Sequence, residues 1–313
     1  MIVVLTGGTG GAKFVQGLAR ILPQSDITAI VNTGDDLRWW GLHVSPDLDS
    51  ITYALAGVLS PERGWGFAAD TFTCLERMRE LGAECWFQIG DRDLATHLRR
   101  AQHLEDGMTL SAATAEIARG MGISASILPM TDDRVETRVL TASGELSFQE
   151  YFVRERYRIQ PQGVRFEGAG QASPAPGVVD AICSAGAVLI APSNPITSIG
   201  PILAVPGIRH ALQTTSAPVA AVSPIVGNAA VSGPAAELMR AQGYPSSPVG
   251  IAKIYADFLD VLLIEETDLT AAAHVGSANV IGARTIMRSD DDKASLARAA
   301  LAAAEAVRSK AGV

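Results

Sequence analysis

The feature that most constrains this chain is its first segment, where a short apolar run leads directly into a cluster of glycines. Residues 2–5 are Ile-Val-Val-Leu, and glycine occupies positions 7, 8, 10 and 11. With the helical stretch over residues 12–22, this order predicts a strand, a tight turn and a helix. Glycines let backbone N–H groups crowd around an anion, and the positive end of the helix points at the same place. The segment therefore predicts a phosphate-binding turn, although a strand-to-helix connection without a ligand fits the same pattern.

The glycine cluster matches neither of the two common phosphate-binding motifs. A P-loop requires Gly-Lys followed by Ser or Thr, whereas Lys13 is followed by Phe14. A dinucleotide fingerprint requires Gly-x-Gly-x-x-Gly, whereas the third glycine position after Gly8 and Gly10 holds Lys13. The broken fingerprint argues against an NAD(P)-dependent oxidoreductase.

Further apolar runs alternate with helical stretches along the chain. Continuous apolar runs are typical of strands that helices cover on both faces. We therefore predict an α/β fold with a mostly parallel sheet and helices on both of its faces. Its expected strands are residues 2–5, 27–31, 187–192, 219–223 and 261–265.

The middle of the chain has a different pattern. Residues 68–122 look mostly helical, and residues 134–153 look like a β-hairpin with its turn at Ser143-Gly144. We therefore predict a nucleotide-binding core made of residues 1–60 and 170–313. Residues 61–169 are expected to form an inserted helical and hairpin region that covers the ligand end of the sheet. An Ala-rich helix is expected over residues 291–310.

Composition excludes several classes of protein. A formal net charge of −8 argues against a nucleic-acid partner. No apolar run approaches the roughly 20 residues that span a bilayer, so no membrane partner is expected. No leader is recognisable, since the apolar start runs into Gly7, and the three cysteines form no C-x-x-C pair. We therefore expect a reducing, cytoplasmic location.

Aspartates gather close to the glycine cluster in the sequence. Asp35 and Asp36 follow the expected second strand, and Asp47 and Asp49 stand two residues apart shortly afterwards. Mg²⁺ typically takes one or two carboxylates together with phosphate oxygens and water. These aspartates therefore predict a divalent-cation site, with ordinary turn and helix-capping duty as the alternative.

The segment Gly90-Asp91-Arg92-Asp93 is the next candidate. Arg92 is suited to a phosphate or a planar ring, and Asp91 and Asp93 would hold its guanidinium in place. The alternative is a solvated helix start in which Asp93 serves as the N-cap.

Two polar turns follow expected strands, and both carry hydroxyl and amide groups suited to a base or a phosphate. The first holds Ser193, Asn194, Pro195 and Ser198, and the second holds Ser223 and Asn228. Trp39, Trp40 and Trp65 are suited to stacking on an aromatic ligand, with packing in the core as the alternative.

Taken together, these motifs resemble the phospholactate transferase family of deazaflavin coenzyme F-420 biosynthesis. The match covers nearly the whole chain and rests on six segments in the family's order. They are Thr6-Gly-Gly-Thr-Gly-Gly-Ala-Lys13, Asn32-Thr-Gly-Asp-Asp36, Ser45-Pro-Asp-Leu-Asp49, Gly90-Asp-Arg-Asp-Leu-Ala-Thr-His97, Pro192-Ser-Asn-Pro-Ile-Thr-Ser-Ile-Gly-Pro201 and Ser223-Pro-Ile-Val-Gly-Asn228.

The resemblance implies a Rossmann-like core, dependence on Mg²⁺ and a homodimer. It also implies two substrates: a small acid linked to guanosine diphosphate, and 7,8-didemethyl-8-hydroxy-5-deazariboflavin. The ribityl hydroxyl of the deazaflavin attacks the phosphorus next to the acid, and GMP leaves. Phospholactate, phosphoenolpyruvate and 3-phosphoglycerate all remain open as the acid.

Carried over segment by segment, the resemblance implies a role for each motif. Asp35, Asp49 and Arg92 are expected to be catalytic. Asp35 and Asp49 are also expected to bind the metal, and Arg92 to contact the deazaflavin. The residues expected to bind the substrates are Gly7, Gly8, Thr9, Gly10, Gly11, Lys13, Asn32, Asp36, Asp91, Ser193, Asn194, Pro195, Ser198, Ser223 and Asn228.

A non-catalytic nucleotide-binding regulator is the alternative from a different functional class. Related proteins outside deazaflavin biosynthesis resemble this chain in the glycine cluster and the Ser-Asn-Pro turn. Binding of a deazaflavin distinguishes the two hypotheses, because only the enzyme requires it.

Overall fold

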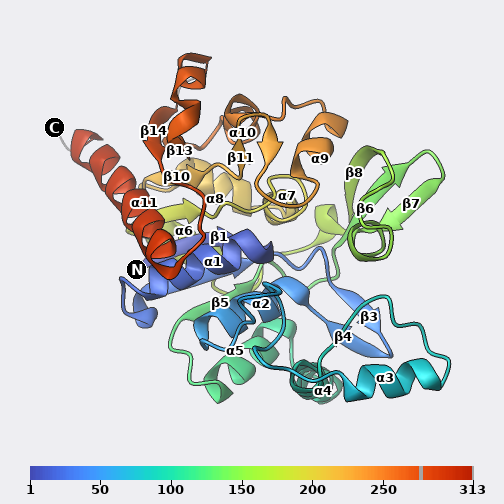
Figure 1. The fold of residues 1–313 in the computed structure, drawn as a ribbon. Coiled ribbons are helices and arrows are strands. Elements are labelled where there is room, and N and C mark those ends of the chain that lie inside the picture. Colours follow the sequence, from blue (N-terminus) through green and yellow to red (C-terminus); the bar gives the residue numbers. More distant parts are fainter. Residues whose placement is uncertain (275–277, 312–313) are drawn as a thin grey trace.

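A computed structural model describes residues 1–274 and 278–311, and its centre is a seven-stranded sheet (Figure 1). The strand order is β14-β13-β10-β9-β1-β2-β5, and every neighbouring pair is parallel. The predicted α/β class with a parallel sheet is therefore confirmed. The strands are β1 (Ile2–Thr6), β2 (Ile27–Val31), β5 (Ser126–Pro129), β9 (Ala187–Ile190), β10 (Val219–Val222), β13 (Val261–Glu265) and β14 (Asn279–Ala283).

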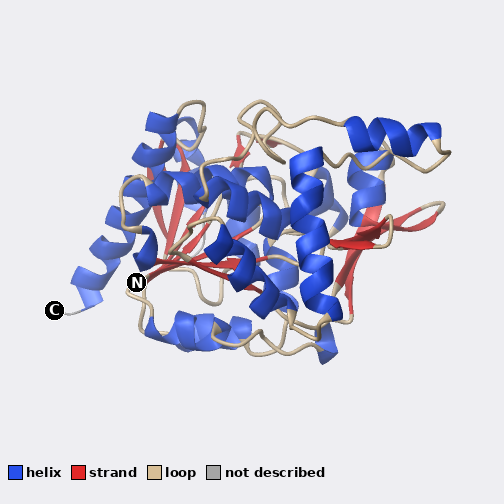
Figure 2. Cartoon of the chain, turned by 90° about the horizontal axis from the view of Figure 1, so that it is seen from below, coloured by secondary structure: helices blue, strands red, loops and turns tan. Residues whose placement is uncertain are grey.

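Helices cover both faces of this sheet (Figure 2), which explains why its inner strands are almost entirely apolar. Val4 packs with one set of helices, and Val3 and Leu5 pack with the other, because successive strand side chains point to opposite faces. The first set comprises α1 (Gly8–Ala19), α2 (Pro46–Leu55), α5 (Leu110–Gly120) and α11 (Asp290–Ala311). The second comprises α6 (Val178–Ser184), α7 (Ile199–Ala204), α8 (Ile208–Thr214), α9 (Ala235–Ala241) and α10 (Pro248–Ile254).

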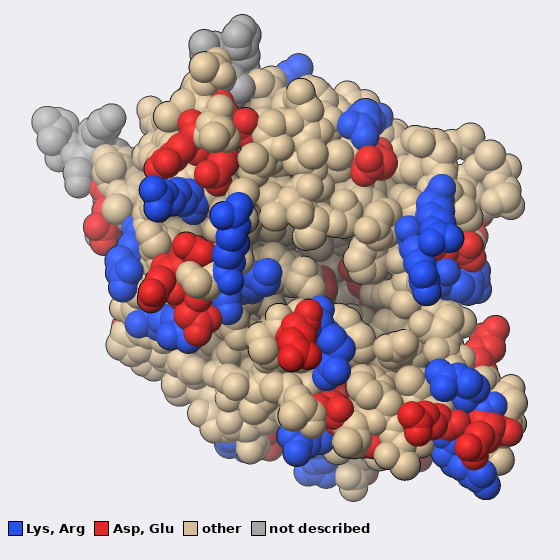
Figure 3. Space-filling model, in the orientation of Figure 1, with Lys and Arg blue, Asp and Glu red and all other residues tan. Residues whose placement is uncertain are grey.

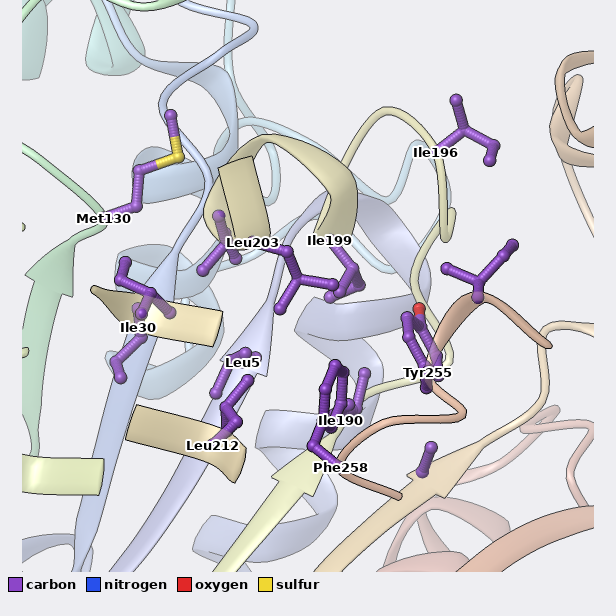
Figure 4. Packing of buried hydrophobic residues seen from close by; sticks show 14 of the residues in the cluster. Leu5, Ile30, Met130, Ile190, Ile196, Ile199, Leu203, Leu212, Tyr255 and Phe258 are labelled. Carbon is purple, nitrogen blue, oxygen red and sulfur yellow. The ribbon is translucent and has the colours of Figure 1, made fainter. Parts of the chain in front are cut away.

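Figure 4 shows the core on the second face, where Leu5, Ile30 and Ile190 of three strands meet Leu203 and Leu212 of the helices. All five side chains are buried. The predicted C-terminal helix is confirmed as α11, which packs along α1.

The structure corrects the expected insertion over residues 61–169, because two elements within that range belong to the core: helix α5 covers one face of the sheet, and β5 is one of its strands. Strand β5 lies within that range, yet it pairs with β2 at the edge of the main sheet. The chain therefore leaves the core twice, before and after β5. A four-residue strand that contains Ser126 and Pro129 has too little apolar pattern to be recognised in the sequence.

The first excursion contains α3 (Thr73–Glu80) and α4 (Asp91–Glu105), and it follows a small hairpin of β3 (Leu37–Trp39) and β4 (Leu42–Val44). The second contains a three-stranded sheet of order β7-β6-β8, which includes the expected hairpin. Its strands are β6 (Glu136–Thr141), β7 (Gly144–Ser147) and β8 (Pro161–Glu167), and the π-helix η2 (Glu150–Arg154) follows β7.

The remaining elements are short. They are the 3₁₀ helices η1 (Gln24–Asp26), η3 (Ala169–Gln171) and η4 (Glu266–His274), with the hairpin of β11 (Ile225–Val226) and β12 (Ala229–Ala230). No helix within residues 1–274 and 278–311 is both long and apolar enough to cross a bilayer.

The strand order reverses between β1 and β9, since β2 and β5 follow on one side and β10, β13 and β14 on the other. Parallel sheets bind ligands beyond the carboxyl ends of the strands at such a reversal. Figure 1 shows the β3–β4 hairpin and the three-stranded sheet beyond these ends. The fold therefore directs attention to the turns after β1 and β9.

Candidate functional site

A cavity of about 900 Å³ lies beyond the carboxyl ends of the strands. Figure 3 shows the surface hollowed near its centre, with acidic side chains in the depth of the hollow. The cavity is lined by the turn after β1, the first turns of α2 and α4, the turn after β9, and the segment around η2. A volume of this size is typical of a site for a small ligand.

The glycine cluster forms the start of α1, which begins at Gly8 and not at the predicted residue 12. Gly8 has a φ of +64°, a conformation that favours glycine, and its N–H donates to Asp47 Oδ1 over 2.7 Å. A Cβ on Gly10 would collide with the carbonyl oxygen of Pro192. The turn after β1 and the turn after β9 are therefore packed backbone against backbone, and the first N–H groups of α1 lie at the cavity.

Ser193 ties these two turns together. Its Oγ accepts the N–H of Gly7 over 3.2 Å and donates to the Gly7 carbonyl over 2.7 Å. The two predicted phosphate-binding segments are thus brought together, as their positions after strands β1 and β9 require.

Asp35 and Asp47 form a buried acidic pair on this side of the cavity. Burial, followed by the charges of Asp47 and Asp36, raises the pKa of Asp35 well above its ordinary value. Burial likewise raises the pKa of Asp47 to about 6, although Asn32 Nδ2 donates to its carboxylate over 2.9 Å. No Lys, Arg or His in the described part of the chain forms an ion pair with either carboxylate, and Asp35 Oδ1 has no hydrogen-bond partner there.

This pair fits a divalent cation, because two uncompensated buried carboxylates are stabilised by positive charge. Within residues 1–274 and 278–311, no three His, Cys, Asp or Glu side chains gather into a complete metal cage. A metal held here would therefore complete its coordination with phosphate oxygens and water, which is the usual arrangement for Mg²⁺.

The predicted metal ligand Asp49 has a different environment. The guanidinium of Arg100 binds both of its oxygens, with Nη1 3.2 Å from Oδ2 and Nη2 on Oδ1. Both side chains are almost fully buried. The structure thus neutralises Asp49 with an arginine. The carboxylate that faces Asp35 is Asp47, which belongs to the predicted acidic cluster but is not one of the two metal ligands that the resemblance implies.

The structure also separates the members of the Gly90–Asp93 segment. Asp91 accepts the backbone N–H groups of Thr73 and Cys74 and so caps α3. Arg92 is exposed and lies in a separate groove of about 750 Å³ between α4 and α5, with Arg99 and Arg119. Only Asp93 lines the main cavity. The structure therefore does not bring Arg92, an expected catalytic residue, to Asp35 and Asp47.

The other expected residues divide in the same way. Those that line the cavity are Gly7, Gly8, Thr9, Gly10, Lys13, Ser193, Asn194, Ser198 and Ser223. Those outside its lining are Gly11, Asn32, Asp36, Pro195 and Asn228. Asn32 supports Asp47 from behind, and Asp36 is bound by His43 over 2.9 Å and Ser45 over 2.6 Å.

Aromatic side chains line the cavity on the side of the two excursions. Phe148 and Phe152 stack with ring centroids 5.4 Å apart and planes at 11°. Trp65 lines the cavity as expected, whereas Trp39 and Trp40 do not; Trp39 packs edge-on against Trp86 at 4.6 Å. The cavity therefore combines a polar end with backbone N–H groups and carboxylates, and an aromatic end suited to a planar ring.

Comparison with known proteins identifies the family of this chain. The family model described as 2-phospho-L-lactate transferase CofD matches residues 2–304. A phosphoenolpyruvate transferase of Streptomyces coelicolor is 45% identical in an alignment of 315 positions that covers 98% of this chain and 99% of that protein. A 2-phospho-L-lactate transferase of Methanosarcina mazei is 45% identical over 267 residues, 85% of this chain and 88% of that protein.

A solved structure has the same fold. It is a member of the UPF0052 family from Bacillus halodurans, which covers 96% of this chain with a TM-score of 0.65 at 16% identity. The family match over nearly the whole length and the relatives at 45% identity decide the assignment. The chain therefore belongs to the 2-phospho-L-lactate transferase CofD family of transferases.

Proposed function

We propose that this chain is a Mg²⁺-dependent transferase of coenzyme F-420 biosynthesis. It moves a phospho-acid from its guanosine diphosphate-linked donor to the ribityl hydroxyl of 7,8-didemethyl-8-hydroxy-5-deazariboflavin and releases GMP. The single observation that carries the metal and phosphate chemistry is the uncompensated pair Asp35 and Asp47 at the N-terminus of α1. Transfer at phosphorus depends on positioning and charge neutralisation, which such a site supplies.

Different parts of the cavity would bind the two substrates. The first N–H groups of α1, Lys13 and the Ser193 turn would hold the diphosphate and the guanosine side of the donor. Asp35 and Asp47 would hold Mg²⁺, which neutralises charge on the phosphate oxygens when it is bound. The deazaflavin ring would lie against the aromatic end, where Phe148, Phe152 and Trp86 line the cavity.

Phosphoenolpyruvate is the first acid to test. The two relatives cited above are both 45% identical to this chain. The one named phosphoenolpyruvate transferase aligns over 98% of this chain, and the one named 2-phospho-L-lactate transferase aligns over 85%. The three candidate acids differ by a methyl, a methylene or a carbinol, so a few side-chain contacts decide between them.

Mass spectrometry of the products tests the proposal. The purified chain is incubated with the deazaflavin and each of the three guanylylated acids, with Mg²⁺ and with a chelator. We expect a deazaflavin phosphodiester and GMP from at least one acid, only when Mg²⁺ is present. Guanosine nucleotide binding without deazaflavin binding or product would favour the non-catalytic regulator. Light scattering on the same sample tests the proposed homodimer.

A further inference from the structure

Two helices bring a second set of titratable side chains to the cavity wall. Asp49 and Tyr53 are one turn apart on α2, and Asp93, His97 and Arg100 follow one another at intervals of four and three residues on α4. These spacings place each set on one face of its helix. Arg100 binds Asp49, and the His97 ring lies between the two carboxylates, 3.6 Å from Asp49 Oδ2 and 3.3 Å from Asp93 Oδ1.

The two oxygens of Asp93 have different environments. The Tyr53 hydroxyl donates to Oδ1 over 2.6 Å, and His97 Nε2 faces the same oxygen. Oδ2 accepts no hydrogen bond from the described residues and faces Gly66, where an added Cβ would lie 4.0 Å away. Both Gly66 and Asp93 line the cavity. One oxygen is thus held by the protein, and the other is directed to the substrate side.

Asp93 does not serve as the N-cap of helix α4. The start of α4 is capped by Asp70, whose Oδ1 accepts the N–H of Arg92 over 2.9 Å and whose Oδ2 accepts the N–H of Asp93 over 3.2 Å. Asp93 is 7% exposed and forms no ion pair with Lys or Arg in the described ranges. A buried carboxylate that neither Lys nor Arg neutralises is costly, so its presence at the cavity points to chemistry.

Tyr53 is suited to hold this carboxylate in place. Burial, followed by the charges of Asp49 and Asp93, raises the pKa of Tyr53 well above its ordinary value, so the phenol keeps its proton. Its hydroxyl can therefore only donate to Asp93 Oδ1. Asp49, which Arg100 binds, lies on the other side of the His97 ring. The next charged or titratable groups beside Arg100 are Asp36, which precedes β3, and His43 of β4.

We propose that Asp93 is the general base that deprotonates the attacking hydroxyl, an inference that rests on the proposed function. Asp93 Oδ2 takes the hydroxyl proton as the hydroxyl oxygen bonds to phosphorus. The bond between that phosphorus and the bridging oxygen breaks, GMP leaves with the electron pair, and Asp93 returns its proton to solvent. Tyr53 and His97 are positioning residues that aim Oδ2 at the hydroxyl.

Asp93→Asn tests the proposal, with Asp91→Asn two residues away as the matched control, because Asp91 lies outside the cavity. We expect Asp93→Asn to lower kcat at least about a hundredfold, which is the ordinary contribution of a general base, with KM for both substrates and Mg²⁺ binding within about threefold. Asp91→Asn should keep kcat within about threefold. In Asp93→Gly, added formate should restore part of the lost rate, because it replaces the missing carboxylate.

Three outcomes would overturn the assignment. One is an Asp93→Asn enzyme with near-normal kcat, another is a loss of Mg²⁺ binding equal to the loss in kcat, and the third is an Asp93→Gly enzyme that formate leaves unchanged. If Asp93→Asn does not fold, formate rescue of Asp93→Gly remains the deciding measurement. An inactive native chain would refute the proposed function itself, whereas an active native chain with an active Asp93→Asn variant refutes only the role of Asp93.

Discussion

The two acidic walls of the cavity are made of the same residue type, but their charges are balanced in different ways. On one wall, Asp35 and Asp47 are buried next to each other without a cation, and burial raises both pKa values. On the other wall, Asp49 is bound by Arg100, and His97 separates it from Asp93. Helix α2 contributes to both, since Asp47 faces Asn32 and the N-terminus of α1 while Asp49 faces α4.

The comparison teaches that the partner of a buried carboxylate, and not its position in a motif, indicates its role. A carboxylate pair that lacks positive charge is prepared to receive a cation from solution. A carboxylate that an arginine already neutralises does not require a cation from solution, and it instead holds the neighbouring side chains in place. The following predictions test this division, from the largest expected effect to the smallest.

Arg100→Met should have the largest effect on stability. It leaves the Asp49 carboxylate buried without its cation, and removing one partner of a buried ion pair costs about 3–5 kcal/mol. Chemical denaturation measures the change in the free energy of unfolding. The adjacent and exposed Arg99→Met serves as the control and should change it by less than about 0.5 kcal/mol. If both variants changed the free energy of unfolding equally, the proposal that Arg100 neutralises a buried Asp49 would be contradicted.

Asp35→Asn and Asp47→Asn should each lower turnover at least about a hundredfold, equivalent to about 2.7 kcal/mol of transition-state stabilisation. Neither should lower thermal stability, because each removes an uncompensated buried charge. Turnover at saturating Mg²⁺ and thermal unfolding are measured on the same preparations. Near-normal turnover in both variants would refute the metal site, and a large loss of stability would show that the pair is structural.

The stability of the metal-free chain should depend on pH through Asp47. Because its pKa in the folded chain is about 6 and the ordinary value is 3.8, the folded state binds the proton more tightly than the unfolded state. The stability from this proton is fully present below pH 3.8 and is lost as the pH rises towards 6. Relative to the native chain, Asp47→Asn should therefore gain up to about 3 kcal/mol across this window.

Denaturation at several pH values in a chelating buffer checks this prediction. A difference between Asp47→Asn and the native chain that stays constant from pH 4 to pH 6 would contradict the raised pKa. Added Mg²⁺ should stabilise the native chain more as the pH rises, because metal and proton compete for the same carboxylates.

Arg92→Ala should have the smallest effect. The sequence motif suggests a deazaflavin contact, but Arg92 lies in the groove between α4 and α5, outside both walls. We expect turnover and deazaflavin affinity to stay within about threefold of the native chain, as is usual for an exposed side chain away from the site. Calorimetric titration of deazaflavin and of GDP measures this. A selective loss of deazaflavin affinity would restore the role that the motif suggests.

Most of the fold could be predicted from the sequence, because continuous apolar runs such as residues 27–31 mark buried parallel strands. The exceptions are short or carry interrupting residues. Strand β5 ends at Pro129, and β14 contains Gly282, so neither has the pattern of a central strand. The sequence predicts a turn at the glycines before the first helix, whereas in the structure the glycines form the first turn of α1. The sequence could not place this boundary, because only the backbone hydrogen bonds fix where a helix begins.

The sequence by itself determined the α/β frame, the glycine turn after the first strand and the presence of acidic residues near it. These features depend on local pattern and residue type, which are visible along the chain. Only the tertiary structure decided which aspartates remain uncompensated. Asp49 and its partner Arg100 are 51 residues apart, and Asp93 meets Tyr53 across 40 residues. The charge balance of a buried carboxylate is set by whichever helix docks against it, and no local spacing specifies that contact.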